Sequence, residues 1–78
     1  GTQWRKREKE LQDRRNTASR MIQQNQDRIQ VLYEDMVSGL VDKDDFFLWK
    51  KNYEDKMSSA KAELAECEKE AIKIKKQF

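Results

Sequence analysis

The stretch LYEDMVSGLVDKDDF, Leu32 to Phe46, decides the fold because it contains Gly39, one of only two glycines in the chain. Long, charged, proline-free stretches with helical spacing of apolar residues lie on both sides of it. Glycine suits the left-handed position after a helix C-terminus. Asp42, with Asp45 three residues later, resembles the capping box that begins a helix. We therefore predict an all-α fold, a two-helix antiparallel coiled-coil hairpin. The expected elements are a helix over about residues 4–37, a turn over 38–42 and a helix over about 43–77.

Apolar residues in each half recur at steps of four and three, as at the a and d positions of a coiled-coil heptad. We call the line of a and d positions the seam. Pairing residues whose numbers add up to 82 places an a position opposite a d position in every layer, from Met36–Phe46 at the turn to Trp4–Phe78 at the termini. Small side chains then face large ones, which favours close packing over a length of about 50 Å at about 1.5 Å per residue. Four polar residues interrupt this seam: Glu8, Arg15, Asn25 and Lys50.

Composition limits the possible functions. The 78 residues are 41% charged and include no proline and no histidine, which is typical of a long-helix protein and removes the usual general base and commonest metal ligand. The single cysteine, Cys67, excludes an internal disulfide and fits a reducing compartment. No catalytic set, metal site, cofactor site or membrane-spanning apolar run is visible. We expect one helical module without enzymatic activity of its own, either a fragment of a larger protein or a self-associating piece.

Charge is divided along the predicted hairpin. The first 15 residues carry six basic and three acidic side chains, whereas residues 33–45 carry five acidic side chains and Lys43 alone as a base. The end with the termini is therefore basic and the turn is acidic. Two interpretations remain open: solvated helix faces, or an open end that lies near DNA or another polyanion.

Apolar residues outside the seam are concentrated near the turn. A two-helix hairpin has one seam and cannot bury all of them, although Leu40 and Val41 are expected to cap the end of the core. The remaining aromatic and aliphatic side chains indicate a protein-contact surface, whose partner is a second copy, tip to tip or side to side, or another protein. The candidate surface consists of Tyr33, Val37, Leu40, Val41, Phe47, Leu48 and Trp49.

The segment from Leu32 to Met57 resembles the coiled-coil insertion of large serine recombinases, the integrases and transposon recombinases of phages and mobile elements. The resemblance covers the central third of the chain, and the flanks match only as charged heptads. It consists of the pattern LYEDxxxGLVxxxxF…Y, formed by Leu32, Tyr33, Glu34, Asp35, Gly39, Leu40, Val41, Phe46 and Tyr53.

This resemblance implies a bacterial or phage-encoded, cytoplasmic parent that performs site-specific DNA recombination with a serine nucleophile. The parent's catalytic domain, recombinase domain and zinc-ribbon domain lie outside this chain, so zinc is expected there and not here. In the family, coiled coils of DNA-bound subunits contact each other, which stabilises synapsis and helps to set the direction of integration or excision. A directionality factor acts near the same region.

Two other functions remain as alternatives. One is a generic helical-hairpin adaptor that binds an unrelated partner helix in a groove. The other is a weak nucleic-acid binder that acts through basic residues near both termini. The basic residues concerned are Arg5, Lys6, Arg7, Lys73, Lys75 and Lys76.

Overall fold

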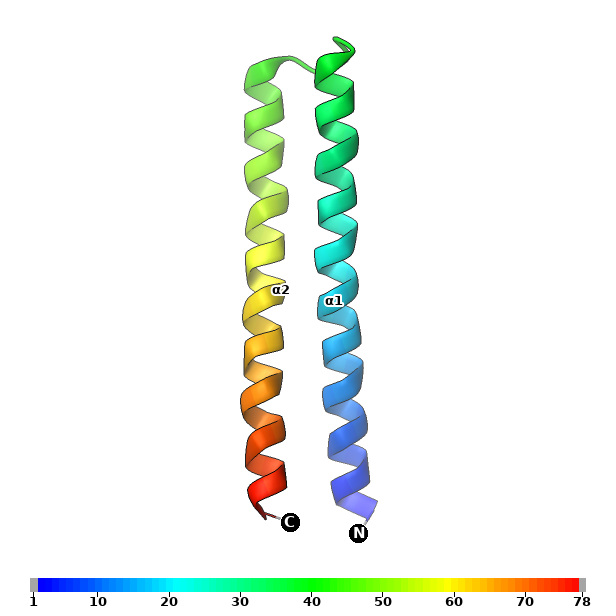
Figure 1. Cartoon of the computed structure of the whole chain (residues 1–78), viewed down its shortest axis with the longest axis vertical. Coiled ribbons are helices and arrows are strands. Elements are labelled where there is room, and N and C mark those ends of the chain that lie inside the picture. The colour runs from blue at the N-terminus through cyan, green and yellow to red at the C-terminus, as the bar shows by residue number, and fades with distance from the viewer. Residues whose placement is uncertain (1, 78) are drawn as a thin grey trace.

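The computed structural model describes residues 2–77, which form two long helices packed side by side in opposite directions (Figure 1). Helix α1 spans Thr2–Val37 and helix α2 spans Lys43–Gln77. The predicted hairpin and its turn at residues 38–42 are confirmed, and α1 begins two residues earlier than expected. The molecule is a rod of 57 × 15 × 11 Å. Both termini lie at one end, which we call the open end, and the turn forms the tip.

Helix α1 ends in a Schellman motif centred on Gly39. The backbone N–H of Leu40 donates to the carbonyl of Asp35 at 2.8 Å, and the N–H of Gly39 donates to that of Met36 at 3.1 Å. Gly39 has a φ of +85°, in the left-handed region, and a Cβ atom built there meets no atom within 4 Å. Backbone conformation alone, and not a lack of space, therefore selects glycine at this position.

Helix α2 begins with Asp42 as its N-cap. The Asp42 Oδ1 atom accepts a hydrogen bond from the backbone N–H of Asp45 at 2.9 Å. Asp45 makes no reciprocal side-chain bond to Asp42 among the described residues, so the expected capping box is only half formed. The Asp45 side chain is one methylene shorter than the usual Glu. Asp44 and Asp45 also lie in the first turn, where carboxylates interact favourably with the helix dipole.

The seam contains every residue that is buried in the described part of the chain. Its buried members come from both helices and include several small side chains, which allows the helices to approach closely. Glu8 is the one described seam residue that is exposed, and the predicted Trp4–Phe78 pair lies partly outside the described residues. The buried residues are Leu11, Ala18, Asn25, Phe46, Ala60, Cys67 and Ile74.

Two polar seam residues are incompletely hydrogen-bonded. Asn25 is only 3% exposed; its Nδ2 atom donates to the Met21 carbonyl one turn earlier at 2.7 Å, and its Oδ1 atom is buried without a partner. Asn25 therefore bonds within α1 and not across to α2. Arg15 forms a 3.5 Å ion pair with Glu68, but its Nε atom is buried without a hydrogen-bond partner. Buried unpaired polar atoms cost stability, so the seam is weaker at these layers than an all-apolar seam.

Candidate functional site

The tip carries most of the large apolar side chains that the fold leaves exposed. We call the seven predicted residues around the turn the tip surface. Val41 is half-buried, and the other six are exposed, with Leu40 at 78% and Leu48 at 67%. The expectation that Leu40 caps the core is wrong. In a Schellman motif the residue after glycine usually packs on the residue five or six positions earlier, but here those positions are held by Asp35 and Glu34, which offer no apolar contact.

Aromatic contacts organise one side of the tip. The Tyr33 ring meets the buried Phe46 ring edge-on, with centroids 6.2 Å apart, and Phe46 meets Phe47 in the same way at 5.3 Å. Tyr33 and Phe47 occupy the heptad e positions of their helices, and e positions lie on the same side of an antiparallel seam. Val37 follows Tyr33 by one turn. These three exposed residues form what we call the Tyr33/Phe47 side of the tip.

Trp49 lies on the opposite side of the seam, at a heptad g position. There it lines a shallow groove of about 530 Å³ together with Leu40, Val41 and Tyr53, and neither Tyr33 nor Phe47 contributes to that groove. Leu48 faces outward from the back of α2, next to Trp49. The structure therefore divides the predicted tip surface between two sides and the back of α2, instead of gathering it into one patch.

An acidic rim surrounds the tip. Residues 33–45 hold five carboxylates and one lysine, a formal net charge of −4. Four of the five carboxylates are exposed, and Asp35 is half-buried. Two tips brought together would therefore repel each other at low ionic strength. The acidic residues are Glu34, Asp35, Asp42, Asp44 and Asp45.

The open end has a groove, lined by both apolar and charged side chains, that the sequence did not predict. The groove has a volume of about 730 Å³, and Ile72 on its wall is 53% exposed. One signal for it exists in the sequence: the polar Glu8 faces Ile74 in the seam, beside the small Ala71, so this layer lacks a large apolar side chain from α1. The apolar lining consists of Trp4, Leu11, Ala71, Ile72 and Ile74.

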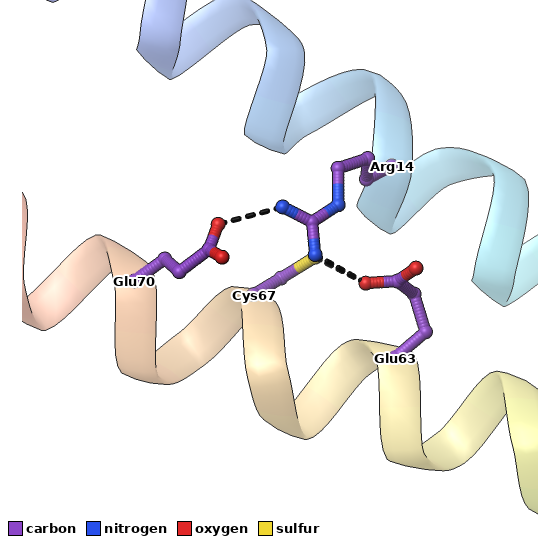
Figure 2. A network of polar contacts seen from close by, with 4 residues as sticks. All are labelled: Arg14, Glu63, Cys67 and Glu70. Atoms are coloured by element: carbon purple, nitrogen blue, oxygen red, sulfur yellow. Dashed lines mark hydrogen bonds and ion pairs between the residues drawn. The ribbon is translucent and has the colours of Figure 1, made fainter.

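A polar cluster joins the helices on the side of the seam opposite Tyr33 and Phe47. Arg14 donates from Nη1 to Glu70 Oε2 at 2.6 Å and from Nη2 to Glu63 Oε1 at 2.5 Å (Figure 2). The hydrogen bond from Arg14 holds the pKa of Glu63 below its usual value, while the bonds to both carboxylates raise the pKa of Arg14. Cys67 Sγ lies 3.7 Å from the same Glu63 oxygen, and burial raises the pKa of this thiol.

This cluster connects the two helices through side chains of both. Cys67 is fully buried, and this burial raises the pKa of its thiol, which disfavours the thiolate form. Arg14 is already bonded to two carboxylates from α2, and it therefore links the helices and sets their register in the open half.

Within residues 2–77, no group of three or more Cys, Asp or Glu side chains is arranged to hold a metal ion. Neither described helix has a stretch long and apolar enough to cross a membrane.

Comparison of the chain with protein-family models, with curated proteins and with solved structures finds no match.

Proposed function

We propose that this hairpin is a protein–protein interaction module that works through its tip, by contact with a second copy of itself. One observation carries the proposal: six large apolar side chains remain exposed around the tip, outside the buried seam of the rod. Exposed aromatic and aliphatic residues that cluster in this way mark contact surfaces. The rod holds this surface at the end opposite both termini, as a stiff spacer would.

We further propose that the parent protein is a large serine recombinase, in which this contact stabilises synapsis and helps to set the direction of recombination. The support is the LYEDxxxGLVxxxxF…Y pattern, whose Gly39 and Phe46 occupy the helix cap and the first buried layer of the seam. DNA would be bound by the parent's zinc-ribbon domain, and a directionality factor is a second candidate partner. If the chain is part of a longer protein, paired zinc-ribbon cysteines on both sides of it support this parent, and other flanking domains contradict it.

The tip contact is tested by light scattering at protein concentrations up to about 1 mM. We expect the wild type to show a concentration-dependent dimer and the Phe47→Ala/Trp49→Ala double variant to remain a monomer. Met21→Ala is the matched control because Met21 is an exposed apolar residue in the middle of the rod, far from the tip. A wild type that stays monomeric over the whole range contradicts self-contact, and binding to a foreign helix instead supports a generic adaptor.

Nucleic-acid binding at the open end is a second candidate function. The fold brings Arg5, Lys6 and Arg7 of α1 to the same end as Lys73, Lys75 and Lys76 of α2. All six are exposed, and none forms an ion pair within residues 2–77. A duplex affinity tighter than about 10⁻⁶ M at physiological salt, falling steeply with added salt, supports this function. Weaker binding leaves the basic residues as a solvated surface.

A further inference from the structure

The Tyr33/Phe47 side of the tip and the open-end groove lie on the same long side of the rod. Tyr33 and Phe47 are at heptad e positions, and so are Arg5 and Lys75, which line the groove. The ion pair between Arg15 and Glu68 crosses the seam on this side, whereas Arg14 crosses it on the other. One side of the molecule therefore carries both a protruding aromatic pair and a groove that is lined in part by apolar side chains.

These two features have opposite electrostatic surroundings. Residues 3–15 and 68–77 form the open end and together hold ten basic and five acidic side chains, a formal net charge of +5. The tip has a net charge of −4 over residues 33–45. A tip is therefore repelled by another tip but attracted to the open end of another copy.

We propose that two hairpins associate side by side and antiparallel, each placing Tyr33 and Phe47 in the open-end groove of the other. This inference rests on the proposed self-contact and identifies the surface that receives the tip. A two-fold axis across the rods relates the two contacts, so the interface is self-complementary and closes as a dimer. It also explains how an acidic tip can take part in contact between identical chains.

The spacing along the rod is consistent with this arrangement. Tyr33 and Leu11 are 22 residues apart on α1, or about 33 Å at about 1.5 Å per residue, and Phe47 and Ile72 are 25 residues apart on α2, or about 38 Å. When the two-fold axis crosses the rods midway between the tip residues and the groove residues, Phe47 of one copy lies opposite Ile72 of the other. The same register places Glu34 opposite Lys9.

The available area is sufficient for a stable dimer. A standard interface buries about 800 Å² on each partner. The rod has a total accessible surface of 6239 Å², and its broader side measures 57 by 15 Å, so full-length overlap provides an area of that order. Between the two contacts, α1 presents the uncharged Ser19, Gln23 and Gln26, whereas the e positions of α2 hold Glu54 and Lys61.

Matched alanine variants distinguish this arrangement from other kinds of self-contact. We expect Phe47→Ala and Ile72→Ala each to weaken dimerisation by about tenfold or more, because each removes half of the same apolar contact. Trp49→Ala and Met21→Ala, on the other side of the seam, should leave the dissociation constant within about twofold. The measurement is sedimentation equilibrium, with circular dichroism to check that each variant is folded.

Salt dependence provides a second readout. Attraction between the acidic tip and the basic open end predicts that dimerisation weakens as NaCl is raised from about 50 to 500 mM. Direct contact between two acidic tips predicts the opposite, because salt screens their repulsion. A dimer that strengthens with salt overturns the antiparallel arrangement and leaves the proposed self-contact intact.

A distance measurement separates the remaining outcomes. The distance is measured between spin labels attached to a Lys43→Cys variant. Each label reacts with the introduced thiol because Cys67 is fully buried. The antiparallel dimer places the two labels about 50 Å apart, which follows from the helical rise, whereas a tip-to-tip dimer places them within about 20 Å. The short distance overturns this inference alone. A monomer at about 1 mM overturns both this inference and the proposed self-contact.

Discussion

The tip half and the open half of the rod are held together in different ways. At the tip, a Schellman motif ends α1 and Asp42 caps the start of α2. The aromatic Phe46 fills the seam layer nearest the turn. In the open half, the seam is built around the fully buried Cys67 with Leu11 and Ile74, and the Arg14 ion pairs link the helices from one side.

This difference separates the residues that stabilise the fold from those available for contact. Among the described large apolar side chains, the open half leaves only Ile72 exposed and holds Trp4 and Leu64 half-buried, whereas six are exposed around the turn. Removing an exposed tip residue should therefore leave the fold stable, and removing a buried residue of the open half should not. Each of the following changes tests this division.

The largest expected effect is that of Leu11→Ala. Leu11 is 6% exposed and packs with Cys67 and Ile74, so its truncation should lower the free energy of unfolding by about 2–5 kcal/mol. The control Leu48→Ala truncates an equally large but exposed residue of the tip. It should change the free energy of unfolding by no more than about 0.5 kcal/mol. Urea unfolding followed by circular dichroism measures both. Equal losses would show that the tip is part of the folding core.

Asn25→Leu should stabilise the hairpin, in contrast to most core substitutions. The Asn25 Oδ1 atom is buried without a partner, so an apolar side chain of similar size removes an uncompensated desolvation cost of about 1–3 kcal/mol. Gln26→Leu, at the exposed neighbouring position, is the control and should have little effect. A lower melting temperature for Asn25→Leu would indicate that a water molecule or an alternative side-chain position satisfies the amide oxygen.

Gly39→Ala tests the turn separately from the seam. A Cβ atom at Gly39 has free space, so the expected loss is the conformational cost of a left-handed alanine, about 1–2 kcal/mol. Gly39→Asn should lose less, because asparagine tolerates this conformation better. Thermal unfolding of the two variants gives the comparison. Equal losses would mean that contacts of the added side chain, and not the backbone, determine the cost.

The smallest effect concerns pH. The pKa of Glu63 is lowered in the folded protein by its hydrogen bond from Arg14, so this pair stabilises the hairpin at neutral pH. That contribution is lost as the pH falls below 4.5, the usual value for Glu, and through the lower folded pKa. It is small because both side chains are more than one-third exposed.

The matching measurement is melting temperature between about pH 7 and pH 2.5. We expect Glu63→Gln to be less stable than the wild type at neutral pH and to lose less stability on acidification. Glu66→Gln, which removes an exposed carboxylate without an ion pair in the described chain, should follow the wild-type profile. Parallel profiles for wild type and Glu63→Gln would exclude a stabilising role for the pair.

Much of the fold was predictable because it depends on local and periodic signals. Gly39 and Asp42 act through backbone groups within a few residues of themselves, and the seam follows from regular spacing. One part of the candidate site was also predictable: apolar residues near the turn had to be exposed, because a single seam cannot bury all of them. The outward position of Leu40 was not, because it depends on how the chain leaves the left-handed glycine and on what Asp35 offers for contact.

The sequence by itself determined the hairpin, its turn, the residues of the seam and the separation of acidic and basic ends, because each follows from helical periodicity, capping chemistry or simple order along the chain. Only the tertiary structure decided which exposed residues share a side. It divided Phe47 from Trp49, although they are two residues apart, and placed Phe47 on the same side as the groove beside Ile72. The reason is physical: antiparallel packing aligns positions that are distant in sequence, and a helix turns adjacent positions to different faces.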